Sequence, residues 1–506
     1  MSQKEDFFKY LTEGYSPKGD SIIMGAAMLN NETLTGAHVK IPLKTMNRHG
    51  LIAGATGTGK TKTLQIIAEQ LSRQGVPSLL MDIKGDLSGI AAASDGHPKI
   101  DERHEKIGLD YEAHSSPVEI MTISKQDGIR MRATVSEFGP VLLSRILDVT
   151  ETQAGIISVV FKYCDDHKLP LLDLDDLKKV LQYATGTGKE EFQSEYGRIS
   201  TSSTGAILRK IIELEQQGAD QFFGERSFEV KDLVRKDKNG HGYVNVIRLT
   251  DIQDRPKLFS TFMLSLLAEI YSTFPEQGDA DKPELVMFID EAHLIFDQAS
   301  DALQDQIENI VKLIRSKGIG LYFVTQNPTD VPEGVLSQLG LKIQHALRAF
   351  TAKDRKAIKL TAQNYPISDY YDTADVLTSL GIGEAFISAL DEKGRPSPLA
   401  ATLLRAPASR MDVLTDRELS DLIADSELTD KYNEEINRES AEELLQEKIE
   451  KANEDEIKEK AKAEKEKTRK KSSSTRKSTR QNPIVKVLTS ASFIRGVMGI
   501  LGRALK

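Results

Sequence analysis

Gly54-Ala55-Thr56-Gly57-Thr58-Gly59-Lys60-Thr61 is the stretch that decides the fold class of this 506-residue chain. It fits the spacing G-x-x-x-x-G-K-[ST], in which glycines let backbone N–H groups wrap around a phosphate chain. Apolar residues 51–53 predict a strand before it, and apolar residues at helical spacing predict a helix after it. Because a helix N-terminus favours anions, we expect the stretch to hold a nucleoside triphosphate, with the Lys60 ammonium at the phosphates. The residues expected to touch the nucleotide are Gly54, Ala55, Thr56, Gly57, Thr58, Gly59, Lys60, Thr61 and Lys62.

A second stretch, residues 184–189, repeats the sequence Ala-Thr-Gly-Thr-Gly-Lys of residues 55–60. It has Tyr183 where the first glycine should be and Glu190 where the hydroxyl residue should be, so nothing there can ligate magnesium as Thr61 can. The residues before it predict a charged amphipathic helix and not a buried strand. We interpret this near-copy as a helix-ending loop and not as a second nucleotide site.

Two acidic residues follow an apolar run that predicts a central strand. Residues 285–289 contain no polar side chain, as expected of a parallel strand covered on both faces, and Asp290 and Glu291 come directly after them. A magnesium-dependent NTPase needs one carboxylate for the hydration shell of the metal and a second to polarise the attacking water. We assign Asp290, with Thr61, to Mg²⁺ and Glu291 to the water.

Polar residues also end two other predicted strands. The buried run at residues 321–325 leads into Thr325 and Gln326, which are expected to lie beside Asp290 and to hydrogen-bond the γ-phosphate or the attacking water. A plain strand-end turn before the Asn-Pro pair remains the alternative. Asp82 and Asp86, at the end of the strand predicted at residues 77–82, have two interpretations as well: nucleotide-facing groups or loop-turn aspartates.

The alternation of strands and helices predicts an α/β fold with a mostly parallel central sheet, an all-helical insertion and a charged helical C-terminal extension. Short strands are expected near residues 22–25 and 38–42, and a strand with an arginine is expected within 340–350. The expected segments are a short N-terminal segment at 1–47, a first core part at 48–136, a helical insertion at 137–225, a second core part at 226–407, a charged extension at 408–467 and a basic tail at 468–506. We expect disorder at 468–480 and an amphipathic helix at 484–505.

Composition narrows the classes of protein to which the chain can belong. The net charge is −9, yet residues 468–506 hold ten basic residues and no acidic one, so any contact with a polyanion is expected to be local. The single cysteine, Cys164, cannot form an intramolecular disulfide. There is no apolar run of the length that spans a membrane and no apolar signal segment at the start. We therefore expect a cytoplasmic protein without a membrane span.

A series of motifs resembles the HerA/FtsK branch of P-loop ATPases, and most closely the HerA-like helicases of bacteria, over roughly residues 20–405. The motifs are residues 49–63, Met81-Asp82-Ile83-Lys84-Gly85-Asp86, Phe288-Ile289-Asp290-Glu291-Ala292-His293 and Val324-Thr325-Gln326-Asn327-Pro328. The resemblance implies a RecA-like ATPase that uses ATP and Mg²⁺. It also implies a homo-oligomer, a hexameric ring with duplex DNA in its pore and the ATP sites between subunits.

The resemblance also suggests which arginines serve the site. In such rings an arginine from the neighbouring subunit neutralises charge in the transition state. Arg48 and Arg315 fall where similar proteins place functional arginines, and Arg348 and Arg355 are weaker candidates. Ordinary surface ion pairs remain the alternative for each of the four.

The segment before the phosphate loop departs from the family pattern. HerA proteins typically carry a β-barrel there that serves assembly and recruits the NurA nuclease, whereas only 53 residues precede the loop here. We expect the barrel to be reduced or absent, which leaves the nuclease partner and a stable hexamer open. Two functions stay in view: a DNA-translocating ATPase, and an ATP-driven factor that assembles or remodels protein partners through the C-terminal extension.

Overall fold

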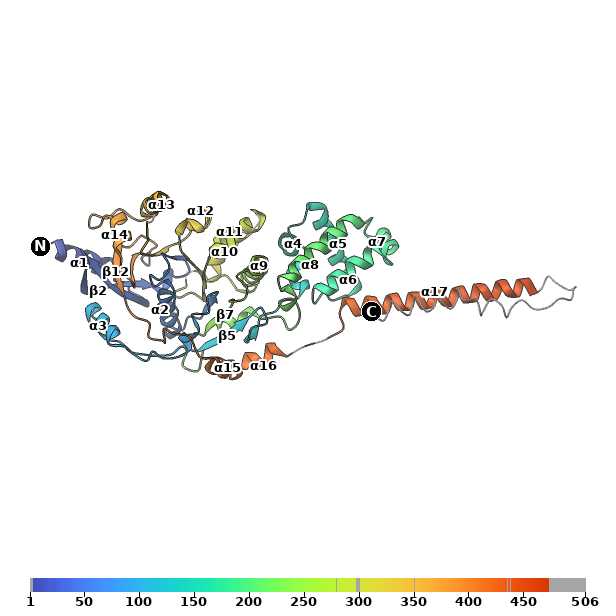
Figure 1. Ribbon diagram of the computed structural model, residues 1–506, viewed down its shortest axis with the longest axis horizontal. Helices are drawn as coiled ribbons and strands as arrows, with labels where there is room; N and C mark the ends of the chain where they lie inside the picture. Colours follow the sequence, from blue (N-terminus) through green and yellow to red (C-terminus); the bar gives the residue numbers. More distant parts are fainter. Residues whose placement is uncertain are drawn as a thin grey trace. The chain divides into compact units, whose positions relative to one another are not determined.

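The computed structural model describes residues 3–278, 280–296, 301–349, 351–434, 436 and 438–472. The chain divides into two compact units, Met1–Leu444 and Leu445–Lys506. The first unit holds a large sheet with helices around it (Figure 1). In the second unit the described residues belong to the long helix α17 (Ala441–Ser472).

Twelve strands among the described residues form one sheet in the first unit. Their order is β2-β1-β12-β11-β10-β3-β9-β8-β4-β7-β5-β6. The strands from β10 to β6 run parallel, whereas β11, β12, β1 and β2 are each antiparallel to their neighbours. The bounds are β1 Ser21–Leu29, β2 Glu32–Pro42, β3 Gly50–Ala53, β4 Ser78–Asp82, β5 Val118–Thr122, β6 Ile129–Arg130, β7 Val244–Arg248, β8 Leu285–Ile289, β9 Ile319–Thr325, β10 Leu341–His345, β11 Glu384–Ser388 and β12 Ala400–Leu404. The predicted α/β fold with a mostly parallel sheet is confirmed.

The strand order decides which loops meet. β3, which leads into the phosphate loop, pairs with β9, and β9 pairs with β8, the strand before Asp290. Because the carboxyl ends of parallel strands share one edge of a sheet, the loops that follow β3, β9, β8 and β4 all lie along that edge. The opposite edge carries the amino ends of the same strands.

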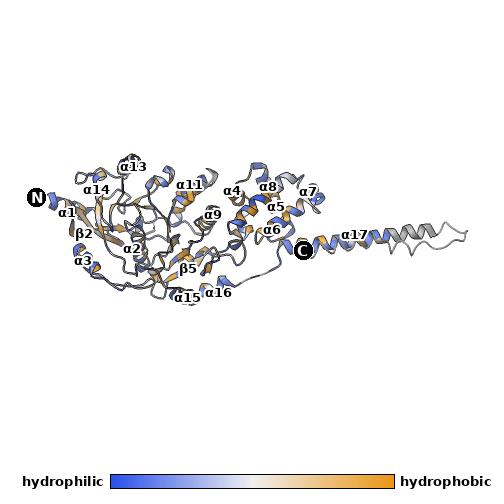
Figure 2. Cartoon of the chain, in the orientation of Figure 1, coloured by the Kyte–Doolittle hydropathy of each residue, from blue (hydrophilic) through white to orange (hydrophobic). Residues whose placement is uncertain are grey.

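The core sits on both faces of the sheet, because side chains alternate along each strand. One cluster joins Ile387 and Leu404 to helices α1 and α2, and a cluster on the other face joins Phe386 and Leu403 to α14. In Figure 2 apolar residues gather on the strands and on the inner sides of the helices. All five residues of β8 are buried, which explains why that strand is uniformly apolar.

Five helices, α4 to α8, lie between β6 and β7 and stand apart from the sheet (Figure 1). Polar N-caps start several of them: the side chains of Thr134, Thr150 and Asp173 accept backbone N–H groups of the first turn. The near-copy of the phosphate loop connects α6 to α7 in this helical segment, as predicted. The helices are α4 Val135–Ile146, α5 Glu151–His167, α6 Leu174–Thr185, α7 Lys189–Glu195 and α8 Thr201–Gln216.

The remaining helices cover the sheet or follow it. They are α1 Gln3–Gly14, α2 Lys60–Arg73, α3 Pro98–Ile107, α9 Pro256–Thr273, α10 His293–Phe296, α11 Asp301–Ile314, α12 Glu333–Leu336, α13 Ala352–Gln363, α14 Thr373–Ser379, α15 Asp416–Ala424 and α16 Glu427–Asn433. In α17, ion pairs join glutamates to lysines four residues later, at 3.0 Å for Glu447–Lys451 and 3.2 Å for Glu454–Lys458. Every helix in the described ranges is too short or too polar to cross a lipid bilayer.

Three expectations need adjustment. The strand expected within 340–350 ends at His345, so Arg348 follows the strand instead of lying in it. The short strands expected near the start are longer, and they join the main sheet through β12. Residues 468–472, expected to be disordered, continue α17. The rest of the expected disordered stretch and the helix expected at 484–505 lie outside the described residues, and the segment boundaries themselves stay predictions.

Candidate active site

The phosphate loop connects β3 to α2 in backbone conformations that require glycine. Gly54 has a φ of +151° and Gly59, the residue before α2, has a φ of +111°. A Cβ on Gly54 would lie 2.5 Å from the Cβ of His345, closer than two carbon atoms can approach. The first glycine of the motif is therefore a packing requirement as well as a conformational one.

Lys60 folds back over this loop. Its Nζ donates hydrogen bonds to the carbonyl oxygens of Gly54 at 2.7 Å and Ala55 at 3.3 Å. Burial lowers the pKa of Lys60, and the nearby ammonium of Lys84 lowers it further. The ammonium thus lies inside the loop that is expected to enclose the phosphates.

His345, at the end of β10, packs against the phosphate loop and α2. Its Nε2 lies 2.9 Å from the hydroxyl of Thr63 in α2, and its side chain is completely buried. Burial lowers the pKa of His345 to about 4, and the charge of Lys60 acts in the same direction. The imidazole is therefore neutral, and it fixes α2 against the strand that neighbours β3.

Asp290 and Glu291 lie at the carboxyl edge of the sheet, both nearly buried, at 4% and 6% exposure. Desolvation raises the pKa of Asp290 to about 6; the Lys84 ammonium opposes this rise and the Glu291 carboxylate adds to it. Oε1 of Glu291 forms an ion pair with Lys84. Oε2 lies 3.4 Å from Nδ1 of His293 but forms no hydrogen bond with any described residue. Among the described residues, this oxygen of Glu291 is therefore a buried acceptor without a hydrogen bond.

Asp82 explains how Lys84 comes to face Glu291. Its carboxylate accepts the backbone N–H groups of Gly85, Asp86 and Leu87 at 2.7 to 3.1 Å. These bonds fold the turn after β4 and leave Lys84 at its tip. Of the two interpretations of Asp82, the structure supports the loop-turn aspartate.

The end of β9 brings Gln326 beside the phosphate loop. Ala53 pairs with Thr325 across the two strands, and the N–H of Gly54 donates to the Thr325 carbonyl at 3.3 Å. Gln326 is exposed, whereas the hydroxyl of Thr325 is engaged by Asp330 at 2.5 Å. The role of Gln326 at the nucleotide stays a prediction, whereas the hydroxyl of Thr325 serves the turn.

Lys62 points away from the loop. Its Nζ donates to the carbonyl oxygen of Met411 at 2.5 Å, in the segment that follows β12. Thr61, by contrast, lies in the first turn of α2, next to Lys60.

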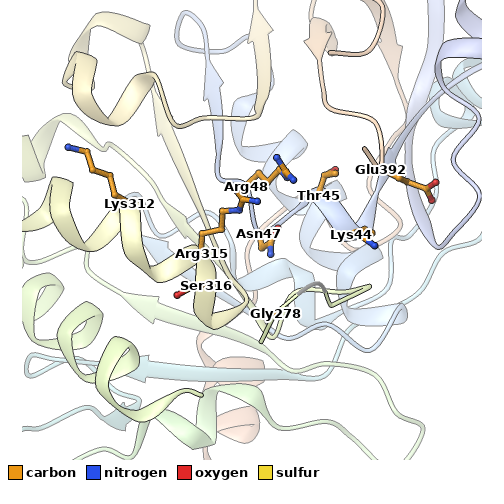
Figure 3. A pocket seen from close by; sticks show the side chains of 9 residues that line it. All are labelled: Lys44, Thr45, Asn47, Arg48, Gly278, Lys312, Arg315, Ser316 and Glu392. Carbon is orange, nitrogen blue, oxygen red and sulfur yellow. The ribbon is translucent and has the colours of Figure 1, made fainter. Parts of the chain in front are cut away.

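Arg48 and Arg315 lie together, but at the opposite edge of the sheet. Arg48 precedes β3 and Arg315 follows α11, and both line a pocket of about 300 Å³ (Figure 3). β9 has seven residues, so its two ends are roughly 20 Å apart at about 3.3 Å per residue. The two arginines therefore cannot reach the phosphate loop of their own chain. Arg348 instead follows β10 and donates to the Thr378 carbonyl at 3.2 Å.

Comparison with known proteins assigns this arrangement to a family. A model of the family described as "Helicase HerA-like C-terminal" matches residues 27–503. The chain belongs to the HerA-like helicase family. It is 22% identical over 359 residues to the "DNA double-strand break repair helicase HerA" of Sulfolobus acidocaldarius, covering 70% of this chain and 64% of that protein. For the protein of the same name from Saccharolobus solfataricus the identity is 25% over 355 residues, covering 69% and 63%. The chain thus spans less than two thirds of the length of these relatives.

Solved structures agree on the fold of this HerA-family chain. The unbound bacterial conjugative coupling protein TrwB is similar with a TM-score of 0.52 at 14% identity, covering 80% of this chain and 94% of that one. The TrwB complex with an ATP analogue has the same TM-score at 15% identity and the same coverage. The fold is therefore that of the RecA-like P-loop ATPases, as predicted.

Sequence reasoning did not single out three residues of the HerA-type site. Lys84 and His293 face Glu291, and His345 underlies the phosphate loop. Lys84 and His293 appeared in the sequence only as members of motifs. His345 comes 291 positions after Gly54, although its side chain leaves no room for a Cβ on that glycine. The one available signal was a histidine at the end of β10, the strand beside the loop strand.

Proposed function

We propose that this HerA-family chain is an ATP-hydrolysing motor that translocates or unwinds DNA. The observation that carries the proposal is Glu291: a buried carboxylate at the same edge of the sheet as the phosphate loop, with one oxygen paired to Lys84 and the other without a hydrogen-bond partner among the described residues. An unpartnered buried carboxylate oxygen is where a general base would hold a water molecule.

Each residue of the edge has a separate task. The backbone of residues 54–59 and the ammonium of Lys60 hold the phosphates of ATP. Glu291 accepts a proton from the water that attacks the γ-phosphorus, and Gln326 orients that water or the γ-phosphate. Residue types and placement, and not a bound nucleotide, support these roles.

The donor set also fits Mg²⁺. The Thr61 hydroxyl and the Asp290 carboxylate offer the oxygen ligands that this ion prefers. A cation there would favour the charged form of Asp290, whose pKa burial raises to about 6. When bound, Mg²⁺ neutralises charge on the phosphates.

The arginines complete the proposal. Because Arg48 and Arg315 lie at the far edge of the sheet, they serve the nucleotide of a neighbouring subunit, where their guanidinium groups stabilise the negative charge of the transition state. Head-to-tail contact between identical chains brings the two edges together, and it forms a ring where the rotation closes. We propose that the ring is a hexamer with duplex DNA in its pore, as the motif resemblance implies; the names of the relatives, helicases of DNA double-strand break repair, support DNA as the substrate. A cytoplasmic location stays a prediction of the sequence.

The test is ATP turnover measured with and without duplex DNA. We expect DNA to stimulate turnover, and we expect Glu291→Gln to bind ATP but to lower turnover by about 10² to 10⁴, because the amide cannot accept the proton. Normal turnover in this variant would place the base elsewhere. A well-folded oligomer that no nucleic acid stimulates would instead favour the protein-remodelling alternative.

A further inference from the structure

His49 lies between Arg48 and the first residue of β3, and it is almost fully buried at 2% exposure. Its φ is +57°, in the left-handed region, which residues other than glycine adopt at a cost. A buried imidazole in such a conformation needs an explanation, because the phosphate loop begins only at Gly54 and His49 does not reach it.

Both ring nitrogens of His49 form hydrogen bonds to the backbone of other segments. The N–H of Leu321, in β9, donates to Nδ1 at 3.0 Å. Nδ1 is therefore an acceptor, so the ring proton lies on Nε2, which donates to the carbonyl oxygen of Val311 in α11 at 2.8 Å. Burial lowers the pKa of His49 to about 4, in keeping with this neutral tautomer; the bond to Val311 opposes the shift and the charge of Arg315 adds to it.

These two bonds join the segments that carry the arginines of the pocket. Val311 lies four residues, about one helical turn, before Arg315, and Arg48 directly precedes His49. β9 also packs closely against the turn before β3. The hydroxyl of Tyr322 donates to the Met46 carbonyl at 3.2 Å, and a Cβ on Gly320 would lie 2.3 Å from that oxygen. The end of α11 and the turn before β3 are thus held together through one imidazole.

We propose that His49 is a positioning residue that fixes Arg48 and Arg315 relative to each other, so that both guanidinium groups reach the phosphates of a neighbouring subunit together. The inference rests on the proposed function, in which these arginines act in trans. His49 itself touches neither the nucleotide nor the phosphate loop. Its effect is on the rate of hydrolysis in the adjacent subunit.

Two substitutions separate the two hydrogen bonds. In His49→Asn the amide oxygen can stand near the place of Nδ1 and keep the Leu321 bond, but the side chain is too short to reach Val311, and asparagine tolerates positive φ. In His49→Gln the longer side chain can donate to Val311 from near the place of Nε2. We expect the asparagine variant to bind a fluorescent ATP analogue normally and to lose kcat by about ten- to a hundredfold, because small displacements of charge-stabilising groups are costly. The glutamine variant should keep more of kcat.

Mixed oligomers show whose site is damaged. A Lys60→Ala subunit has no working phosphate loop but has intact arginines, so it should restore hydrolysis at the loop of an adjacent His49→Asn subunit. The mixture should then turn over more ATP than its two components do separately. A mixture without this gain would mean that His49 acts on its own loop or on folding, and the inference would be wrong.

A control mixture separates this failure from failure of the proposed function. Subunits carrying both Arg48→Ala and Arg315→Ala are mixed with Lys60→Ala subunits in the same way. If this control gains activity and the His49→Asn mixture does not, only the role of His49 is refuted. If the control gains nothing either, the arginines do not act in trans, and both proposals fall together.

Discussion

Lys60 presents the clearest test at the level of single residues, because the chain contains its own control. Its ammonium donates to the carbonyl oxygens of Gly54 and Ala55 inside the loop. Lys60→Ala removes the positive charge at the phosphates, so we expect affinity for ATP to fall by at least about tenfold, as for the loss of a charged hydrogen bond of about 1.5 kcal/mol or more.

Lys189→Ala is the matched control. Lys189 ends the near-copy of the loop, is exposed, and is the first residue of α7. Titration with a fluorescent ATP analogue should give the same affinity for this variant as for the unchanged protein. Equal losses in the two variants would mean that the loop after β3 is not the nucleotide site.

Motif spacing predicted where Gly54, Lys60, Asp290 and Glu291 lie, while their roles stay predictions. All four belong to short patterns with an apolar strand before them, so their surroundings can be inferred locally. Lys84 faces Glu291 only because Asp82 accepts three backbone N–H groups and folds the turn between them. Such a role depends on contacts between distant segments, and no spacing pattern in one sequence encodes it.

At the level of helices and strands, a buried carboxylate in α2 forms hydrogen bonds that hold this helix against the segment after β12. Glu69, fully buried, accepts the backbone N–H groups of Ala408 and Ser409 at 2.8 to 3.1 Å and the Ser409 hydroxyl at 2.8 Å. Lys62 donates to Met411 further along the same segment. The helix that begins at the phosphate loop is thus joined to the start of the C-terminal extension, which composition alone did not indicate.

Glu69→Ala should lower the free energy of unfolding by about 3 kcal/mol. The substitution leaves the buried N–H groups of residues 408 and 409 without an acceptor, and a buried donor that has no acceptor lowers stability. Urea denaturation measures the change. Glu112→Ala removes a carboxylate that pairs with Arg73 at 3.2 Å on the surface and should change stability by less than about 1 kcal/mol. Equal effects would contradict the fastening role of Glu69.

Glu269 in α9 gives the first unit a pH-dependent stability. Desolvation first, and then repulsion by Glu137 and Glu229, raises its pKa from 4.5 to about 7. The folded chain therefore keeps a proton at pH values where the unfolded chain has lost it, so stability decreases as pH rises from about 5 to about 7. Glu269→Gln should remove this decrease.

The expected difference between Glu269→Gln and the unchanged protein is small at pH 5 and about 1 kcal/mol in favour of the variant at pH 8, allowing for solvent screening of a partly exposed group. Urea denaturation at the two pH values measures it. Glu112→Gln, which removes a carboxylate at the surface, is the control variant. A variant that is less stable than the unchanged protein at pH 8 would contradict the sign.

Apolar runs were enough to predict the central strands, but they did not predict how the strands at the edge of the sheet pair. β8 and β9 are buried throughout, so their sequences identify them as strands without knowledge of their neighbours. β1 pairs with β12, and Gly25 faces Leu404 across this pair. A pairing between strands so far apart in the sequence depends on the whole chain. This is why the sequence indicated only short strands in this region.

At the scale of the whole molecule, the two halves of the proposed site lie at opposite edges of one sheet. The phosphate loop and Glu291 lie at the carboxyl edge, and the pocket of Arg48 and Arg315 lies at the amino edge, about 20 Å away by the length of β9. A two-fold dimer joins the two edges only if the subunits pack antiparallel, with both edges inside one self-complementary surface. Head-to-tail contact joins them without that condition, and its closed form is a ring.

We therefore expect the protein, with ATP and duplex DNA present, to sediment as a closed ring, and the proposed hexamer would hold six copies of the 56.1 kDa chain. Mass photometry or analytical ultracentrifugation measures the mass directly. Arg48→Ala combined with Arg315→Ala should still assemble if the contact surface is broader than the pocket, yet its turnover should fall by about 10³ or more, the range seen when a trans arginine is lost. A two-fold dimer would contradict the ring. A monomer that hydrolyses ATP at the full rate would rule out arginines in trans, because a single chain cannot carry them from one edge of its sheet to the other.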